Sequence, residues 1–562
     1  MTRRTSILAA LLSIVLLGAC APATPSSAPA DRDAPSGLQR GAKVLTIVGA
    51  EGNVGDFPGV SGGSTASGWD FVHAYLVERN DRDEFVPSLA AEQLSVDRGT
   101  WRINSDGSMD TTWRLRPNVK WHDGTPFTSD DLMFTFMAFM DPELPSRYSE
   151  VLRVMESASA PDPLTFEVHW TRPNAQANEA PALNPMPRHL LEDNYRNDKA
   201  NFGNSPRLST EFVGLGAYRM VRWVQGTEIQ FERFDDYFEG RPPLDRVIVK
   251  FIADPNAVVA NMLSGTADVA WGDRVPLESA VEVRQRWQGT GNEVQFLPIA
   301  DLMQVEIQYR PDVARPRNGL PNRTVRQALY QAIDRQGMVD AVMHGLAPLA
   351  DSWYGPNHVL RPQLQEVIPQ YPYDPARAQH LLAEAGWVRG ADGVLVDQRS
   401  GERFEIQLSV MEPKDERQQA IVADHWKALG AVVSFWTFVK PRDRELEALQ
   451  PGGVLASPKA YEIPYNSRIY SGNISTAANR WTGRDRGGYS NPAVDATLER
   501  LAVTIDPRET LALHRQLVQQ AMGDIAMMTM YFDVNPVLIL NGVKGPVGGT
   551  QLEWNFPVWD KA

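Results

Sequence analysis

Residues 115–134, LRPNVKWHDGTPFTSDDLMF, combine a strand end, a turn and a helix start in one short stretch. Alternating apolar residues from Met109 to Arg116 predict a strand that ends before a proline. Asp123-Gly124 predicts a turn, and Thr128 with Asp131 has the capping-box spacing of a helix N-terminus. The apolar residues that follow have helical spacing: Met133, Phe134, Met137 and Met140. A strand followed by an amphipathic helix is the unit from which α/β layers are built.

The same alternation of short strands and helices continues almost to the end of the chain. Asp374-Pro375 and Asp506-Pro507 place proline at the first position of a predicted helix, and Asn322 is a further helix cap. Gly386 follows the last apolar residue of one of these helices, where glycine favours termination. There is no internal repeat, so the pattern predicts a mixed α/β fold rather than a solenoid.

The chain begins with a basic pair and a short apolar run, Ile7 to Leu17, which is too short to span a bilayer. Small residues then lead to Cys20, the only cysteine. This order predicts a signal peptide over residues 1–19. Leu17-Gly18-Ala19-Cys20 resembles the bacterial lipobox, which implies lipidation of Cys20 and anchoring to a bilayer. The alternative is an incidental thiol in an ordinary cleaved signal.

Residues 20–42 are rich in Pro, Ala, Ser and Thr, a composition typical of a disordered tether. The 562-residue chain carries 55 basic and 69 acidic side chains, a net charge of −14. Such a surface disfavours nucleic acid as a partner, because that affinity depends on Lys and Arg. With its one cysteine lipidated, the chain would form no disulfide and would depend on core burial.

Several of these segments resemble the extracellular solute-binding proteins of the peptide/nickel class, family 5, which supply bacterial ABC importers. Residues 115–134 resemble the strand–turn–helix motif of that family. Six further segments resemble its motifs in the same order along the chain: residues 214–223, 236–245, 263–268, 323–334, 373–387 and 488–495. Most of these residues form caps, turns and strand ends, so they identify the scaffold rather than its ligand.

The resemblance implies an α/β, two-lobe periplasmic-binding-protein fold of the large class, with a hinged cleft between the lobes. Lobe I is expected over 43–65, 210–300 and 525–562. An extra subdomain is expected over 66–209, and lobe II over 301–524. A ligand that touches both lobes would favour their closure.

The resemblance also implies a function. The expected protein is a membrane-anchored, monomeric receptor outside the cytoplasm, in the periplasm or on the outer face of the plasma membrane. It would capture a peptide or peptide-like solute and deliver it to an ABC permease and ATPase complex, without a cofactor. The sequence leaves open a signalling receptor on the same scaffold, and a binder of an anionic solute or a metal chelate. An enzyme is not expected, because no nucleophile–base pair or metal-ligand spacing is visible.

Candidate ligand contacts come from two arguments. Trp271 follows the predicted strand at Asp268 to Ala270, and ligands of α/β folds bind beyond the carboxyl ends of strands. Trp69 follows a Gly/Ser-rich loop and is a further aromatic candidate. The resemblance adds four residues from the segment that contacts ligand in the family: Tyr461, Tyr465, Arg468 and Tyr470. The alternatives are core packing for the tryptophans and a solvated loop for the others.

The charge of residues 461–486 departs from the family pattern. Peptide-binding members commonly place an aspartate there that binds the peptide's α-ammonium. This chain has only Glu462 and Asp485 as acids in that segment, together with four arginines: Arg468, Arg480, Arg484 and Arg486. The composition therefore predicts an anionic or carbonyl-rich ligand group bound by arginine.

Two catalytic interpretations are disfavoured. Gly59 to Gly63 matches the Gly-x-Ser-x-Gly nucleophile elbow, but it lies in a Gly/Ser-rich stretch rather than between a strand and a helix. The nine histidines lack the spacing of a zinc site, and His122, which lies in the turn motif, is expected to be structural.

Overall fold

The computed structural model describes residues 41–49, 69–144, 149–180, 183–438, 443–458, 468–546 and 552–562. The predicted signal peptide, Cys20, the Gly59 to Gly63 motif, Tyr461 and Tyr465 lie outside these ranges.

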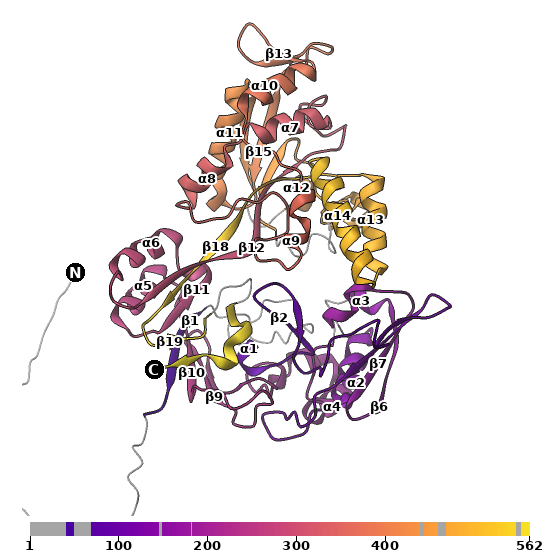
Figure 1. Ribbon diagram of the computed structural model, residues 1–562, viewed down its shortest axis with the longest axis vertical. Helices are drawn as coiled ribbons and strands as arrows, with labels where there is room; N and C mark the ends of the chain where they lie inside the picture. Colours follow the sequence, from indigo (N-terminus) through magenta and orange to yellow (C-terminus); the bar gives the residue numbers. More distant parts are fainter. Residues whose placement is uncertain are drawn as a thin grey trace, which may run out of the picture. The chain divides into compact units, whose positions relative to one another are not determined.

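A mixed ten-stranded sheet forms the backbone of the fold (Figure 1). Its strand order is β16 (Val432–Thr437), β15 (Glu405–Val410), β17 (Gly453–Ala456), β12 (Glu293–Ile307), β18 (Met528–Ile539), β11 (Val269–Trp271), β1 (Val44–Gly49), β10 (Arg246–Phe251), β9 (Glu228–Arg233) and β8 (Tyr218–Val224). Strand β1 is parallel to both β10 and β11, whereas β9 and β18 run antiparallel to their neighbours. The expected α/β fold is confirmed.

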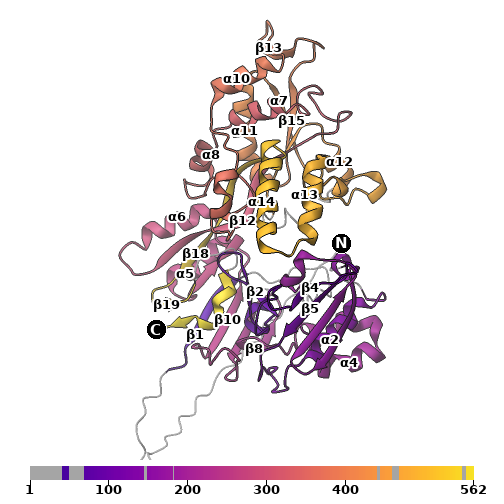
Figure 2. The same ribbon diagram turned by 45° about the vertical axis from the view of Figure 1, so that its right-hand side comes forward.

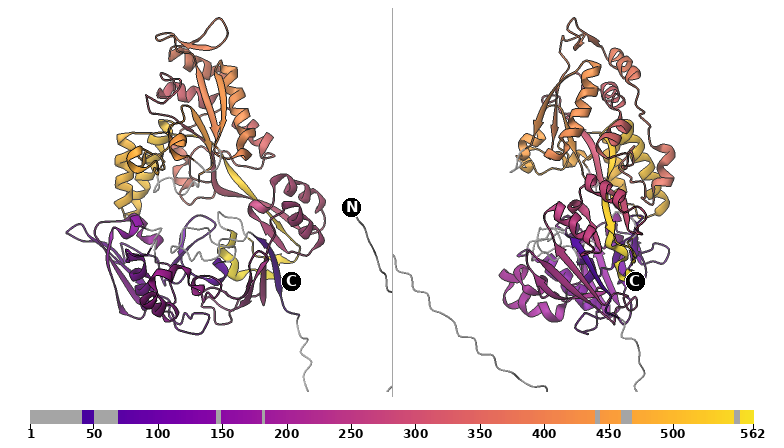
Figure 3. Two further views of the ribbon diagram at one scale, coloured as in Figure 1. Left: turned by 180° about the vertical axis from the view of Figure 1, so that it is seen from behind. Right: turned by 90° about the vertical axis from the view of Figure 1, so that its left-hand side faces the viewer.

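The two long strands β12 and β18 pair with each other and connect the two halves of this sheet (Figures 1 and 3). Residues Glu293 to Pro298 of β12 pair with the end of β18, next to the half that contains β11 and β1. Residues 302–305 pair with the start of β18, next to β17 and β15. The register shifts between Pro298 and Leu302, so the pairing is interrupted where the chain passes from one half to the other.

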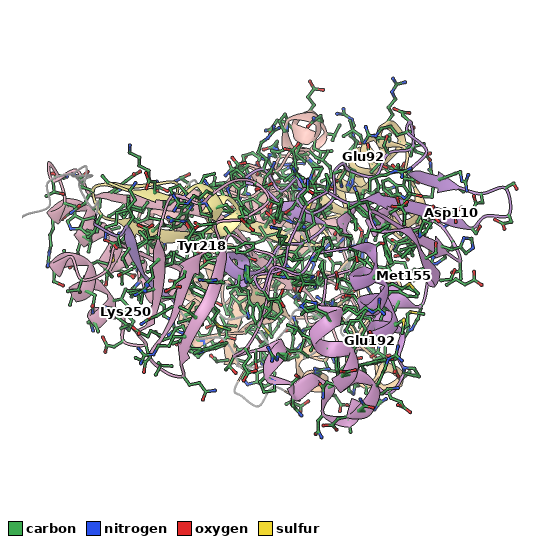
Figure 4. The ribbon with its side chains drawn as sticks, turned by 90° about the horizontal axis from the view of Figure 1, so that it is seen from below. Glu92, Asp110, Met155, Glu192, Tyr218 and Lys250 are labelled. Carbon is green, nitrogen blue, oxygen red and sulfur yellow. The ribbon has the colours of Figure 1, made fainter. Side chains whose placement is uncertain are left out.

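Smaller sheets are built from residues between β1 and β8 and from hairpins. A four-stranded antiparallel sheet contains β4 (Trp101–Ile103), β5 (Met109–Arg114), β7 (Thr165–Trp170) and β6 (Met155–Asp162). Figure 4 labels Asp110 on β5 and Met155 on β6 within this sheet. Three two-stranded antiparallel sheets are β2 (Val77–Arg79) with β3 (Phe85–Pro87), β13 (Trp387–Arg389) with β14 (Leu395–Asp397), and β19 (Val543–Lys544) with β20 (Asp560–Lys561).

Helices cover these sheets (Figure 2). They are α1 (Trp69–Val72), α2 (Ser129–Met140), α3 (Ser149–Leu152), α4 (Arg188–Asn197), α5 (Pro255–Ser264), α6 (Leu277–Arg286), α7 (Arg323–Gln331), α8 (Arg335–Val342), α9 (Arg361–Leu364), α10 (Pro375–Glu384), α11 (Glu416–Leu429), α12 (Arg444–Ala448), α13 (Pro492–Val503) and α14 (Pro507–Gly523). The predicted helix caps are confirmed: the side chain of Asn322 accepts from Thr324 N–H, and Asp374 and Asp506 cap α10 and α14 in the same way.

Residues 115–134 and the strand before them fold as the sequence predicts. Strand β5 is followed by a turn in which Gly124 has a φ of 90°, a conformation that favours glycine. Helix α2 begins after Thr128 with the expected capping box. The buried carboxylate of Asp131 accepts hydrogen bonds from the N–H of Thr128 (3.0 Å), the N–H of Arg188 (3.1 Å) and the indole N–H of Trp121 (3.3 Å). Asp131 therefore connects the turn, α2 and the start of α4.

The buried face of α2 is broader than the methionine spacing indicated. Met137 and Met140 are 42% and 37% exposed. The core contacts come from the other apolar residues of the helix: Leu132, Phe134, Phe136, Ala138 and Phe139. Since α2 is apolar almost all round, its sequence is compatible with more than one buried face.

Candidate functional site

A cavity of about 570 Å³ is formed by segments that are far apart in the chain. One side comes from the β2–β3 hairpin, Trp101 of β4 and the 3₁₀ helix η1 (Ala175–Glu179). The other side comes from residues 353–360 and from the turn between α13 and α14, together with the first half of α14. A hydrogen bond of 3.0 Å from Val359 N–H to the carbonyl of Arg82 joins the two sides. This volume lies within the usual range for small-ligand pockets.

The side formed by the β2–β3 hairpin and η1 is acidic. Asp83, Glu84 and Glu179 line the cavity with one arginine, Arg79. Arg79 lies 3.7 Å from the carboxylate of Asp83, and its guanidinium lies 4.7 Å from the ring centre of Phe85.

Glu179 differs from the other two acids of the cavity. Asp83 lies near Arg79, and Glu84 has Arg82 at 3.8 Å. Within the described part of the chain, Glu179 has neither a hydrogen bond nor an ion pair to its carboxylate. Burial raises the pKa of Glu179 to about 7, although the charge of Arg79 acts in the opposite direction. Desolvation therefore outweighs the nearby positive charge and favours the protonated form of this carboxyl group.

The opposite side is aromatic and uncharged at neutral pH. Trp353 and Tyr354 are each 2% exposed, and the Tyr354 hydroxyl lies 2.5 Å from Nδ1 of His514. Burial lowers the pKa of His358 and of His514 to about 4, so both imidazoles are neutral at pH 7. The cavity therefore places aromatic rings and neutral imidazoles opposite an acidic surface.

Besides Glu179, two cavity residues have a buried polar atom with no hydrogen-bond partner among the described residues. The indole Nε1 of Trp353 is buried with no hydrogen-bond acceptor among the described residues. Gln93 donates from Nε2 to the carbonyl of Asn178 at 2.9 Å, while its buried Oε1 has no described donor. Unsatisfied buried polar atoms are uncommon in folded proteins, so each one calls for an explanation such as a bound water or ion or a functional role.

The ligand contacts predicted from the sequence lie elsewhere. Trp69 is 6% exposed in the core, with its ring 4.7 Å from that of Phe212. Trp271 is half-buried at the end of β11, and its ring lies 6.2 Å from that of Trp559. Tyr470 donates to the carboxylate of Glu499 on α13 at 3.0 Å. None of these three residues lines the 570 Å³ cavity.

Arg468 occupies a second, much smaller site. Its guanidinium lies 2.7 Å from the carboxylate of Glu306 on β12, and both residues line a cavity of about 10 Å³. Arg486 lies 3.9 Å from Glu306 and 3.0 Å from Glu447. The charges of these two arginines are therefore balanced by carboxylates of the protein itself.

Asp485 is buried beside this ion-pair cluster. Its Oδ1 accepts from Gly488 N–H at 2.8 Å, and its Oδ2 has no hydrogen-bond partner among the described residues. Burial raises the pKa of Asp485 well above its usual value, and the charge of Glu306 adds to this effect. Arg480 and Arg484 are exposed. Two of the four arginines in this segment, Arg468 and Arg486, are thus paired with carboxylates inside the protein.

Sequence reasoning missed the residues of the large cavity. Glu179 ends a short polar segment without helical or strand periodicity, and Trp353 and Tyr354 lie in a loop rich in Gly and Pro. The sequence does show two amides and one acid close together in η1: Gln176, Asn178 and Glu179. The residues that complete the cavity lie far away in the sequence, at 353–360 and 504–514.

Comparison with known proteins identifies the scaffold. The profile described as bacterial extracellular solute-binding proteins, family 5 Middle, matches residues 84–489. The chain belongs to this family. The family's two-lobe fold agrees with the fold expected from the sequence motifs.

Individual family members resemble the chain over most of its length. The oligopeptide-binding protein AppA of Bacillus subtilis is 23% identical, over 97% of this chain and 96% of its own. The heme-binding protein A of Haemophilus influenzae is 24% identical, over 75% of this chain and 70% of its own. The structure of NikA from Brucella suis in complex with Fe(III)-EDTA superposes with a TM-score of 0.72 at 18% identity, covering 92% of this chain and 100% of NikA.

The described residues contain no helix with the length and apolar character needed to cross a bilayer. They also contain no group of three or more His, Cys, Asp or Glu side chains arranged to hold a metal ion.

Proposed function

We propose that this family 5 protein is the membrane-anchored receptor of an ABC importer, with a binding rather than a catalytic role. It captures a peptide or peptide-like solute in the 570 Å³ cavity and delivers it to the permease and ATPase complex. The observation that supports this most directly is a ligand-sized cavity in a chain of this family, formed by segments of the proposed extra subdomain and of the proposed lobe II.

The lobe assignment is part of this proposal. Lobe I comprises 43–65, 210–300 and 525–562, lobe II comprises 301–524, and the extra subdomain comprises 66–209. The register shift between Pro298 and Leu302 supports a boundary near residue 300. Because the interrupted pairing leaves β12 and β18 less constrained there, this point is the proposed hinge for lobe closure.

A peptide is the preferred solute class. AppA, which matches over 97% of this chain, is described as an oligopeptide-binding protein, and extended peptides bind mainly through main-chain hydrogen bonds. The heme-binding relative and the Fe(III)-EDTA complex of NikA support a non-peptide solute or a metal chelate as the second candidate. A signalling role on the same scaffold would use the same closure with a sensor partner in place of the permease.

Native mass spectrometry of the protein purified from its host is the direct test. A co-purified peptide that dissociates on denaturation, together with loss of uptake of that peptide when the gene is deleted, is the expected result. A co-purified chelate or heme would replace the peptide assignment. Normal uptake of the co-purified compound in the deletion strain would overturn the transport role.

A further inference from the structure

We propose that the cavity binds a cationic group of the solute, an ammonium or a guanidinium, and that Glu179 is its counter-charge. This inference rests on the proposed function, because it names the chemistry of the solute that the receptor captures. It also differs from the anionic group that the arginine-rich composition of 461–486 predicts.

The first argument is the charge balance of the cavity. Its lining contains three acids, Asp83, Glu84 and Glu179, and one arginine, Arg79. Asp83 and Glu84 each have an arginine within 4.0 Å, whereas Glu179 has none among the described residues. Ionising a partly buried carboxylate without an ion-pair partner is costly, so a cation bound beside Glu179 would be stabilised more than the same cation beside a fully solvated carboxylate.

Other cavity groups do not supply this counter-charge. His358 and His514 face the same space from the opposite side, and burial lowers the pKa of both to about 4. They remain neutral at pH 7. Arg79 lies 3.7 Å from the carboxylate of Asp83 and against the ring of Phe85, and its charge offsets only part of the effect of burial on the pKa of Glu179. A cationic group of the ligand would supply the rest of the positive charge.

The second argument is the presence of further acceptors and flat rings. The Gln93 amide is held on the carbonyl of Asn178, directly before Glu179, and its Oε1 lacks a described donor. An ammonium has three N–H donors and a guanidinium has five, so either group can use Glu179 together with a neighbouring oxygen. Trp101 and Tyr354 also line the cavity and present the aromatic surfaces that cations and their aliphatic stems prefer.

Trp353 adds a requirement on the rest of the ligand. Its buried Nε1 donor has no described acceptor, and it lines the cavity on the side opposite Glu179. A ligand with a cationic group for Glu179 and a carbonyl oxygen for the Trp353 N–H would meet both requirements. A peptide with a free amino terminus, a peptide with a basic side chain, and a free amine that also carries a carbonyl share this chemistry.

The test compares four C-terminally amidated pentapeptides and one carbonyl-containing amine. The peptides are Ala-Ala-Lys-Ala-Ala and Ala-Ala-Nle-Ala-Ala, each with a free and with an acetylated amino terminus, and the amine is lysine amide. Calorimetric titration uses the mature chain, freed of co-purified ligand, as wild type, as Glu179→Gln and as Glu92→Gln. Glu92, which is labelled in Figure 4, is the matched control. It pairs with Arg98 at 2.7 Å and does not line the cavity.

The expected result is at least about tenfold tighter binding of one or more cationic probes than of the acetylated norleucine peptide, the ratio typical of a charged hydrogen bond. Glu179→Gln should abolish this preference, and Glu92→Gln should retain it. Comparison of the probes identifies which cationic group binds: the amino terminus, the lysine side chain or the free amine.

Equal binding of charged and neutral probes, absence of binding by every cationic probe, or an unchanged preference in Glu179→Gln would overturn the inference. Binding of the acetylated norleucine peptide separates the two proposals. If it binds as tightly as the charged peptides, the receptor function stands and the cationic site is rejected.

Discussion

The guanidinium of Arg468 lies 2.7 Å from the carboxylate of Glu306, although the two residues are separated by most of lobe II as we assign it. Glu306 lies near the end of β12, and Arg468 lies in the loop shortly before the 3₁₀ helix at Ser471–Asn473. Both side chains are largely buried, at 11% and 20% exposure. This pair gives Arg468 a structural role that the composition of its segment did not indicate.

Replacing Arg468 should therefore affect stability first. Arg468→Ala leaves the buried Glu306 with a hydrogen bond from Gln304 and, among the described residues, with Arg486 at 3.9 Å as its remaining counter-charge. We expect a loss of about 3 kcal/mol in unfolding free energy. Exposed Arg480→Ala should change it by less than about 0.5 kcal/mol. Thermal unfolding of both variants measures the difference. The ligand-contact interpretation predicts the reverse, unchanged unfolding and binding weakened by about 1.5–3 kcal/mol.

The buried carboxylate of Asp131 is a second stability determinant. Asp131→Ala removes the acceptor of three N–H groups on Thr128, Arg188 and Trp121. We expect a destabilisation of about 3 kcal/mol, because unsatisfied buried donors cost about 1–3 kcal/mol each and water can reach some of them. Thr128→Ala removes only the cap and should cost about 1 kcal/mol. Denaturant unfolding in which both variants match wild type would contradict this role.

Glu179 should give a pH-dependent stability effect in the ligand-free protein. Its pKa is about 7 when folded against 4.5 in its unperturbed state, so the folded protein holds this proton more tightly. Stability from this group is present below about pH 4.5 and is lost as the pH rises toward and beyond 7. Glu179→Gln should accordingly increase the free energy of unfolding at pH 8 by about 1–3 kcal/mol, and much less at pH 5. Thermal unfolding at the two pH values measures this as a higher melting temperature at pH 8. An equal effect at both pH values would show that its carboxyl is not desolvated.

Ligand binding should compact the molecule. A ligand that contacts both sides of the cavity favours the closed form, and it should stabilise the fold by about 2.7 kcal/mol at a hundredfold excess over its dissociation constant. Small-angle scattering with the co-purified ligand should show a smaller radius of gyration. A raised melting temperature with an unchanged radius of gyration would argue for binding without lobe closure.

The lipid anchor predicted at Cys20 has a direct test. The wild-type protein should enter the detergent phase with the membrane fraction, because two or more acyl chains give stable anchoring. Cys20→Ser should be released or remain unprocessed, with its ligand binding intact. A wild-type protein found wholly in the aqueous phase would refute the lipoprotein assignment.

The sequence by itself determined the elements and the scaffold. Helix caps such as Asn322, the turn at Gly124 and the capping box of Thr128 and Asp131 depend on neighbouring residues, so their patterns can be read locally. The motifs from 115 to 495 are built mainly from such caps and turns, and for this reason they identified the family.

Only the tertiary structure decided which side chains meet. Glu179 and Trp353 line one cavity, and Arg468 forms an ion pair with Glu306. Both arrangements exist because the sheet order and the β12–β18 connection bring distant segments together. Whether an arginine is free to bind a ligand depends on the carboxylate opposite it, and no local period or composition specifies that neighbour. The elements follow from short-range propensities, whereas the chemistry of the site follows from long-range packing.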